Sequence, residues 1–314
     1  MKISFVIPTY NREDILCKTL DNVLSHVKLF VEKNQSISVE VIVVDQTKKH
    51  TEQTDAFLAA RSEDIILVKL EKANLPNARN VGIKKSQGDI IVFIDDDVLL
   101  CDSYLESILY EYQDSQIESV VGQIILKNYS GGNVLLNNSG FFKDWTKKIL
   151  MFFFNRRKAS KIISMGCILS DFEKEEAGFS DGGRGCNMSF RKSVFDTIGY
   201  FDNNYIGNAM REETDLFCRM KAHKMKVWYS PKMKLFHLME NTGGCRSSKD
   251  EAAYWDIYFK NQIYFFVKNF RFNLGHIKRI LILDIYKCKR KGIDIKALLD
   301  SSYERAISLL QNQS

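Results

Sequence analysis

The sequence predicts an α/β protein in which a doubly wound, mostly parallel sheet is followed by a C-terminal helical extension. Short apolar segments alternate with helical patterns along the first 125 residues, which is typical of βαβ units with right-handed crossovers. Several of these apolar segments end at polar or acidic residues. Beyond Glu251 the chain is aromatic and basic, with apolar residues at helical spacing.

The first strand is expected at residues 2–8, which are apolar and end at Pro8. Asn11 is the expected N-cap of the next helix, because an Asn side chain satisfies amide groups at a helix start. The apolar residues of that helix recur at helical spacing, so the helix is expected to cover a sheet. They are Leu16, Leu20, Val23, Leu24 and Val27.

Three more strands are expected in the first half of the chain, at 39–44, 65–70 and 90–94. The third of these is preceded by a turn and a short helix that ends near Gly88. After it, Asp102 is the expected cap of a helix with an apolar face.

The second half is expected to begin with a strand at 120–127 and a loop at 129–140, which is rich in Gly and Asn. Residues 141–163 predict either a core helix, which is favoured, or a surface patch that touches lipid. The later elements are a helix and two strands, expected at 213–225, 227–229 and 233–236. The aromatic C-terminal region predicts helices that pack on the sheet or, alternatively, a basic surface on a membrane.

Three carboxylates, Asp95, Asp96 and Asp97, directly follow the buried strand at 90–94. Two unit charges about 4 Å apart repel by roughly 4 kcal/mol at an effective dielectric constant of about 20. Three adjacent ionised Asp residues are therefore unfavourable unless a cation or solvent surrounds them. Mg²⁺ and Mn²⁺ prefer such oxygen ligands, so the triplet predicts a metal site, with a solvated acidic turn as the alternative.

The polar residues after three expected strands are predicted to meet. Residues 9–11, Asp45 and residues 95–97 each follow an expected strand. Because ligands bind outside the carboxyl ends of strands in open α/β sheets, these residues are expected to form one binding edge. No GxGxxG or GxxxxGK[ST] motif follows any strand, which disfavours a dinucleotide-binding or P-loop site.

The composition is that of an ordinary soluble protein, with 45% hydrophobic and 27% charged residues among 314 and a net charge of +6. The seven cysteines include no CxxC pair, so they are expected to be reduced. No apolar run approaches the roughly 18 residues that span a bilayer, and the N-terminus does not resemble a signal peptide. No RNA-binding or zinc-finger spacing is present, so no nucleic-acid partner is expected.

Six motifs in order along the chain resemble those of a family 2 glycosyltransferase, over about residues 1–240. They lie at 5–12, 43–45, 78–82, 93–97, 183–190 and 212–216. The resemblance implies an A-type glycosyltransferase fold, a nucleotide-sugar donor, a divalent metal (Mn²⁺ or Mg²⁺) and inversion at the anomeric carbon. Asp45 is followed by Gln46, Thr47 and Lys48, where the family more often shows a second Asp and a Gly-Ser turn.

The resemblance also implies roles for individual residues. Asp45 would accept from the donor's base, residues 9–11 would line the nucleotide pocket, and Arg79 would lie beside the diphosphate. A loop at 243–246 would close over the donor, with Arg246 on phosphate. The full implied donor-binding set is Pro8, Thr9, Tyr10, Asn11, Asp45, Arg79, Asp95, Asp96, Gly183, Asn187 and Arg246.

Metal ligation and catalysis are implied for five further positions. Asp95 and Asp97 form the DxD pair, in which Asp97 would hold the metal directly and Asp95 or Asp96 would reach the ribose or a metal-bound water. His237 would complete the metal site, although a His after a strand, taken alone, is more often structural. Glu213 stands where the family has its catalytic Asp, so it is the implied general base. The alternatives are Glu212 and Asp215, while acids at a helix start also serve simply as favourable charges.

The implied function is transfer of a sugar from a UDP- or dTDP-linked donor to a hydroxyl group of a glycan or lipid-linked acceptor in cell-surface polysaccharide biosynthesis. The alternative is a non-catalytic nucleotide-sugar-binding scaffold of a membrane complex. A sugar-1-phosphate nucleotidyltransferase is disfavoured, because its Gly-rich N-terminal loop is missing. The expected location is the cytoplasm, with peripheral contact to an anionic membrane surface on the inner face of the plasma membrane through residues 278–291.

The expected organisation is a catalytic domain at 1–240 and a loop with a basic, aromatic helical extension at 241–314. Within the catalytic domain, 1–125 would bind the nucleotide and 126–240 would meet the sugar and the acceptor.

Overall fold

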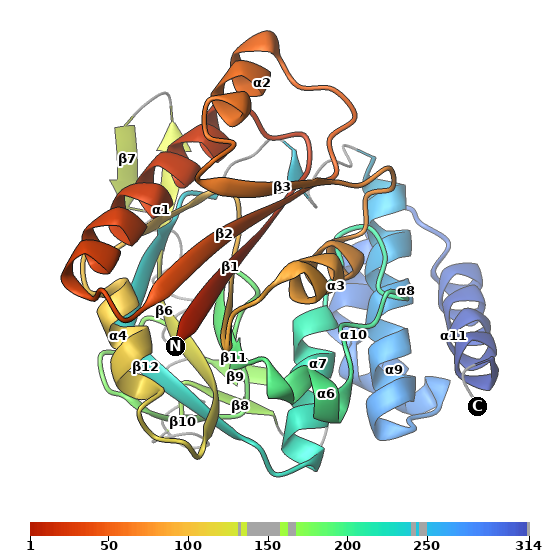
Figure 1. Ribbon diagram of the computed structural model, residues 1–314. Coiled ribbons are helices and arrows are strands. Elements are labelled where there is room, and N and C mark those ends of the chain that lie inside the picture. Colours follow the sequence, from red (N-terminus) through yellow and green to blue (C-terminus); the bar gives the residue numbers. More distant parts are fainter. Residues whose placement is uncertain (131–132, 137–157, 163–167, 240–242, 245–249, 313–314) are drawn as a thin grey trace.

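The computed structural model describes residues 1–130, 133–136, 158–162, 168–239, 243–244 and 250–312 (Figure 1). Its first half alternates strands and helices. These are β1 (Lys2–Thr9), α1 (Asp14–Lys33), β2 (Ser38–Asp45), α2 (Glu52–Ala59), β3 (Ile65–Lys69), α3 (Leu75–Lys85) and β4 (Ile90–Ile94). The four strands are parallel, as the sequence predicts, and they lie in the order β3-β2-β1-β4.

The second half extends this sheet with strands of both directions. Its elements are β5 (Val98–Leu100), α4 (Tyr104–Glu111), β6 (Ile117–Ser130), β7 (Asn133–Leu136), β8 (Ser160–Ile162), β9 (Ile168–Ser170), β10 (Gly178–Ser180), β11 (Asn187–Arg191), α6 (Ser193–Ile198), α7 (Glu212–Ala222) and β12 (Lys226–His237). Strand β11 lies between β4 and β6 and is antiparallel to both, whereas β12 is parallel to β6. Within the described residues the result is a mixed ten-stranded sheet, and β8 and β9 form a separate pair.

Apolar faces explain the layers around the sheet. All five residues of β4 are buried, so this strand is covered on both faces, as in α/β proteins. Helices α1 and α4 lie on one side of the sheet and α3, α6 and α7 on the other (Figure 1). The apolar stripe of α1 includes Leu16, Leu20 and Val23, each fully buried in the main core, as its spacing predicts.

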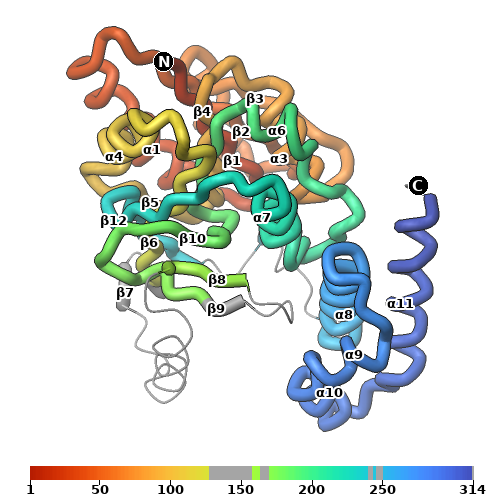
Figure 2. Tube along the Cα trace, turned by 90° about the horizontal axis from the view of Figure 1, so that it is seen from below, coloured from red at the N-terminus to blue at the C-terminus, as the bar shows by residue number. Residues whose placement is uncertain are grey.

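The predicted C-terminal helical extension is confirmed. It consists of α8 (Glu251–Phe270), α9 (Leu274–Ile280), α10 (Ile282–Lys289) and α11 (Ile295–Gln311). These helices stand beside the α/β part (Figure 2) and enclose a second hydrophobic core, in which Phe259, Ile263 and Phe266 of α8 are fully buried. Asp250, Asn273 and Asp294 cap α8, α9 and α11 with their side chains.

Two predicted helix caps are wrong. Asn11 does not cap α1, which begins at Asp14; instead Asn11 has a φ of 51°, and its N–H donates to Thr47 Oγ1 at 2.8 Å. Asp102 does not cap α4, because Ser103 stands at the N-cap position without a side-chain bond. Asn tolerates a left-handed conformation, so it suits a turn as well as a cap.

The remaining differences concern short or irregular elements. The strands expected at 227–229 and 233–236 are one strand, β12, with a register shift between Ser230 and Leu235. The loop expected at 129–140 contains β7, and helix α2 and strand β11 were not expected. Most of the segment 141–163 lies outside the described residues.

Helices of the described residues fall short of the length and apolar character that a membrane span requires. The division into parts at 1–125, 126–240 and 241–314 stays a prediction.

Candidate functional site

The carboxyl ends of the parallel strands meet at one edge, where a cavity of about 630 Å³ opens. Thr9 at the end of β1 pairs in register with Asp45 at the end of β2, and β4 runs beside β1 on its other side. The predicted residues that line the cavity are Pro8, Thr9, Tyr10, Arg79, Asp95, Asp96, Asp97, Glu212, Glu213 and His237. The cavity therefore brings together most of the predicted set.

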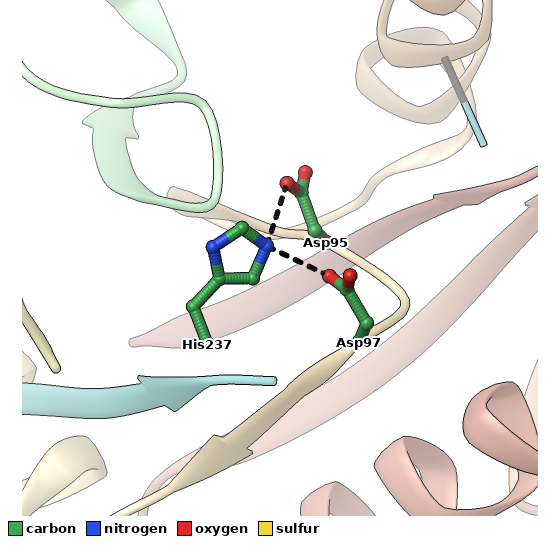
Figure 3. A group of neighbouring side chains, drawn as sticks. All are labelled: Asp95, Asp97 and His237. Carbon is green, nitrogen blue, oxygen red and sulfur yellow. Dashed lines mark ion pairs between the residues drawn. The ribbon is translucent and has the colours of Figure 1, made fainter. Parts of the chain in front are cut away.

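Asp95, Asp97 and His237 lie close together at the end of β4 (Figure 3). His237 Nε2 is 2.9 Å from Asp97 Oδ1 and 3.9 Å from Asp95 Oδ2. Strand pairing explains how so distant a residue arrives, since His237 at the end of β12 pairs with Val98 of β5, just after the Asp triplet.

The same three residues fit a divalent metal. One ligand atom from each lies within 4.8 Å of the others, which is close enough for a shared ion. Carboxylate oxygens with one imidazole nitrogen suit Mn²⁺ or Mg²⁺ rather than a soft metal. Among the described residues, no other cluster of His, Cys, Asp and Glu meets this criterion.

Asp96, the middle residue of the triplet, pairs with Arg12 and is not part of this three-residue cluster. Arg12, which is 5% exposed, lies with Nε 3.4 Å from Asp96 Oδ1 and with a terminal nitrogen 3.5 Å from Asp97 Oδ2. Burial, with the neighbouring Asp97 charge, raises the pKa of Asp96 to about 7. Arg12 thus balances part of the triplet's charge from the loop after β1.

Arg79 is held in the floor of the cavity by acidic side chains. It is 2% exposed, forms an ion pair with Glu212 and lies 3.6 Å from Asp95 Oδ1. A Cβ at Gly185 would collide with the Arg79 guanidinium, so a larger residue at this position would displace it. The cation is therefore fixed between α3, α7 and the Asp triplet.

The two adjacent glutamates at the start of α7 have different environments. Glu212 is 2% exposed and paired with Arg79. Glu213 also lines the cavity, but no described side chain forms an ion pair or a hydrogen bond with it. Burial raises the pKa of Glu213 above its ordinary value, and the Arg79 charge only partly offsets that effect.

Asp215 lies away from the cavity. It is fully buried, and its Oδ2 accepts from Lys268 of α8 at 2.9 Å and from Arg219 at 3.2 Å. Its Oδ1 accepts from Asn269 at 2.8 Å and Tyr205 at 3.3 Å. Every oxygen of Asp215 is therefore used to join α7 to α8.

Asp45 is fully buried and does not line the cavity. It accepts from Lys69 at 2.5 Å, His50 at 2.8 Å and the Thr47 N–H at 2.8 Å. Burial alone would raise the pKa of Asp45, but these bonds outweigh it and lower the pKa. The next residue, Gln46, lines the cavity instead.

Three other predicted residues also lie outside the cavity lining. Asn11 is exposed on its turn. Asn187 is fully buried and donates to the carbonyl oxygens of Gln123 and Met233, both at 2.9 Å, so it joins β11 to β6 and β12. Gly183 packs so closely on Val121 that a Cβ there would collide with it.

Between residues 240 and 249, the loop after β12 is described only at Gly243 and Gly244. The Gly244 N–H donates to the Tyr10 carbonyl oxygen at 2.7 Å, and Gly244 lines the cavity, so this turn lies over the end of β1. Arg246, the predicted phosphate contact, lies outside the described residues.

Several lining residues were absent from the predicted set. They are Arg12, Gln46, Leu75, Arg184, Gly185, Cys186, Asn208, Ala209, Met210 and Tyr254, whereas Gly244 belongs to the loop at 243–246 that was expected to close over the donor. Arg12 and Gly185 lie inside the motifs at 5–12 and 183–190, so these motifs could have indicated them as site residues. Tyr254 stands on α8, and its aromatic surroundings in the sequence carried no such signal.

Comparison with known proteins points to one family. The family model described as "Glycosyl transferase family 2" matches residues 4–172. The glycosyltransferase GlyG of Streptococcus pneumoniae serotype 4 is 26% identical over 133 residues, which are 42% of this chain and 42% of that protein. The alignment thus spans less than half the length of this relative.

Two solved structures share the fold. GalNAc-T7, in a crystal structure with UDP, GalNAc and Mn²⁺, superposes with a TM-score of 0.59 at 14% identity, over 85% of this chain and 50% of that one. The mannosyltransferase PcManGT from Pyrobaculum calidifontis, in complex with GDP-Man and Mn²⁺, superposes with a TM-score of 0.54 at 15% identity. The match covers 99% of this chain and 75% of that one. At these identities the likeness shows the A-type glycosyltransferase fold alone.

Proposed function

The chain belongs to glycosyl transferase family 2, and on that premise we propose that it transfers a sugar, with inversion, from a nucleotide-sugar donor to a hydroxyl group of a glycan or lipid-linked acceptor. The observation that carries the proposal is the cavity at the strand ends, where Asp95, Asp97 and His237 share one space with Glu213, a glutamate that pairs with no described side chain. The donor is proposed to be UDP- or dTDP-linked, and the acceptor to belong to a cell-surface polysaccharide.

The donor's diphosphate is assigned to the floor of the cavity. Arg79 is buried there and fixed by Glu212 and Asp95, so its guanidinium offers a positioned charge for phosphate oxygens. A divalent cation on Asp95, Asp97 and His237, when bound, would neutralise the charge that develops on the leaving diphosphate. The solved neighbours hold Mn²⁺ with UDP or with GDP-Man, which supports this assignment by analogy.

The nucleoside is assigned to the end of β1. Pro8, Thr9 and Tyr10 line the cavity there, and Tyr10 offers an aromatic ring on which a base could stack. Asp45 remains the proposed acceptor for the base, but it would first have to exchange one of its bonds to Lys69 or His50.

Glu213 is proposed as the general base. As the acceptor oxygen attacks the anomeric carbon, the bond from that carbon to the diphosphate breaks, and the hydroxyl proton passes to a Glu213 carboxylate oxygen. A carboxylate that pairs with no described side chain and whose pKa is raised suits this task, because its affinity for a proton is increased. Glu212 cannot serve equally well, since it is committed to Arg79.

The test is calorimetric binding of UDP, GDP, dTDP and CMP, each with and without Mn²⁺. We expect one nucleotide to bind in a metal-dependent way to the wild type, and Asp97→Ala to abolish that dependence. Asp102→Ala, which alters an exposed aspartate a few residues further on, should bind as the wild type does. Binding that ignored both the metal and Asp97→Ala would overturn the assignment of the metal site.

Catalysis is tested separately by incubating the protein with nucleotide sugars and measuring release of the nucleoside diphosphate. Metal-dependent binding without any turnover, across donors and candidate acceptors, would favour the non-catalytic scaffold.

A further inference from the structure

Helix α10 of the C-terminal helical extension exposes an apolar surface. On α10, Ile282, Leu283 and Tyr286 are 61%, 71% and 60% exposed. The opposite side of the same segment carries Leu281 and Cys288, which are buried in the second core. The segment therefore has apolar residues on both sides, and only one side is covered by this chain.

Cations surround this exposed face. Arg279 precedes it, Lys287 and Lys289 lie on its two flanks by helical spacing, and Arg290 and Lys291 follow. Arg279, Lys289 and Arg290 are exposed and form no ion pair with any described residue. The one acid of α10, Asp284, accepts from Tyr258 of α8 at 2.7 Å and pairs with Lys287 at 3.1 Å, so it compensates only one of these cations.

We propose that the face of α10 formed by Ile282, Leu283 and Tyr286, with its flanking cations, docks on an anionic lipid surface. Apolar side chains of this kind insert at the headgroup boundary, and nearby Lys and Arg residues gain from anionic lipids. The unpaired cations decide against an apolar protein partner, since a protein interface would leave them at its centre without counter-charges.

The position of α10 relates this surface to the cavity. Lys291 forms an ion pair with Glu251, and Asp284 accepts from Tyr258, so α10 lies along the N-terminal half of α8. The same half of α8 carries Tyr254, which lines the cavity. Figure 2 shows α10 at the outer end of the helical unit, away from β1 and β4. If the proposed function holds, docking would hold the chain at the membrane that carries a lipid-linked acceptor.

The experiment is flotation of the full chain with vesicles of phosphatidylcholine alone or mixed with phosphatidylglycerol. We expect binding to the mixed vesicles at low salt, weak binding to phosphatidylcholine, and loss of binding as salt rises. The double variant Ile282→Ser/Leu283→Ser and the double variant Lys289→Glu/Arg290→Glu should each weaken binding by about tenfold or more.

Two matched controls alter similar residues elsewhere. Leu29→Ser removes a 56% exposed leucine of α1, and Lys48→Glu/Lys49→Glu reverses two exposed lysines; both should bind vesicles as the wild type does. Nucleotide binding by calorimetry should be unchanged in the α10 variants, so failure of this inference and failure of the proposed function are distinguishable.

Three results would overturn the inference. They are the absence of binding to mixed vesicles at low salt, equal loss of binding in the controls and the α10 variants, and concentration-dependent dimerisation that the Ile282→Ser/Leu283→Ser variant removes. The last result would assign this face to a second copy of the chain.

Discussion

Glu212 and Glu213 show how one residue step along α7 separates two roles. Glu212 faces Arg79 and is buried with it, whereas Glu213 faces the cavity without a partner among the described side chains. Removing Glu212 would leave a buried guanidinium with less compensation, while removing Glu213 would leave the packing intact. The two positions therefore predict different defects.

For Glu213→Gln we expect nucleotide binding to be kept and turnover to fall by about 10²- to 10⁴-fold, the usual loss when a general base is removed. Activity of the wild type should rise with pH through an acid limb above the ordinary glutamate pKa, because burial raises the pKa of Glu213 and only the ionised form accepts a proton. Steady-state rates across pH provide the measurement. Glu63→Gln, on an exposed turn, is the matched control, and a Glu213→Gln enzyme with full activity would exclude Glu213 as the base.

A second prediction concerns Gly185. The added methyl group of Gly185→Ala would collide with the Arg79 guanidinium and displace it from the cavity floor. Nucleoside diphosphate binding should weaken about ten- to a hundredfold, which corresponds to loss of one hydrogen bond to a charged group. Gly275→Ala, where a Cβ meets nothing closer than 3.4 Å, is the control in calorimetry. Unchanged binding in Gly185→Ala would mean that Arg79 does not bind the diphosphate.

At the scale of residues, the sequence predicted that the Asp triplet and His237 belong to one site, because both match positions of known motifs. The sequence could not predict which of the polar residues bind other side chains of the protein and are therefore not free to bind a ligand. Asp45 is bound by His50 and Lys69, which come from an irregular segment and from β3, and only the folded chain shows that these side chains reach it.

At the scale of elements, α7 and α8 are joined by buried charges. Lys268 of α8 contacts Asp215 of α7 at 2.9 Å and Asp202 at 2.7 Å, and the Lys268 side chain is only 19% exposed. This contact attaches the helical extension to the element that carries both glutamates. Packing of α8 is thereby coupled to the position of the cavity wall.

Lys268→Met should therefore lower the free energy of unfolding by about 3 kcal/mol, since it leaves the largely buried Asp202 without its cation and the buried Asp215 with Arg219 alone. Urea denaturation followed by circular dichroism measures this change. Lys260→Met removes another lysine of α8, whose partner Asp256 lies at the surface, and should cost less than about 0.5 kcal/mol. Equal effects of the two variants would contradict the proposed difference.

Element types were predictable where periodicity extended over a long segment, as in α1 and α8. Short elements were not. Strand β11 has only five residues after a Gly-rich turn, and α2 carries just two buried residues, so neither shows a clear period. Both depend on neighbours that are distant in the sequence.

At the scale of the whole molecule, paired carboxylates connect stability to pH. Burial acts to raise the pKa of Asp181 and of Asp202, but hydrogen bonds and charges from lysines outweigh it and lower both. Asp181 accepts from Lys158 at 2.5 Å and from Lys221 at 2.8 Å. Each carboxylate is thus more acidic in the folded chain than in the unfolded one.

A lowered folded pKa contributes stability that is present above the unfolded value, near 4, and is lost as pH falls through the folded value. The free energy of unfolding should accordingly decrease as pH is lowered below about 4. Denaturation midpoints between neutral and acidic pH measure the slope. Asp202→Asn should be less stable at neutral pH and less sensitive to acid. If the slope of unfolding free energy against pH were the same in this variant, Asp202 would not contribute to the pH dependence.

The place of β11 has a consequence for how the chain is made. Strand β4 pairs on one side with β1, but its other neighbour is β11, so Ile94 finds its partner only in Asn187. While the chain leaves the ribosome, β4 is an open, entirely apolar edge until that later segment emerges. The nascent chain is therefore expected to need shielding by chaperones over this interval, and a fragment ending at residue 125 to aggregate.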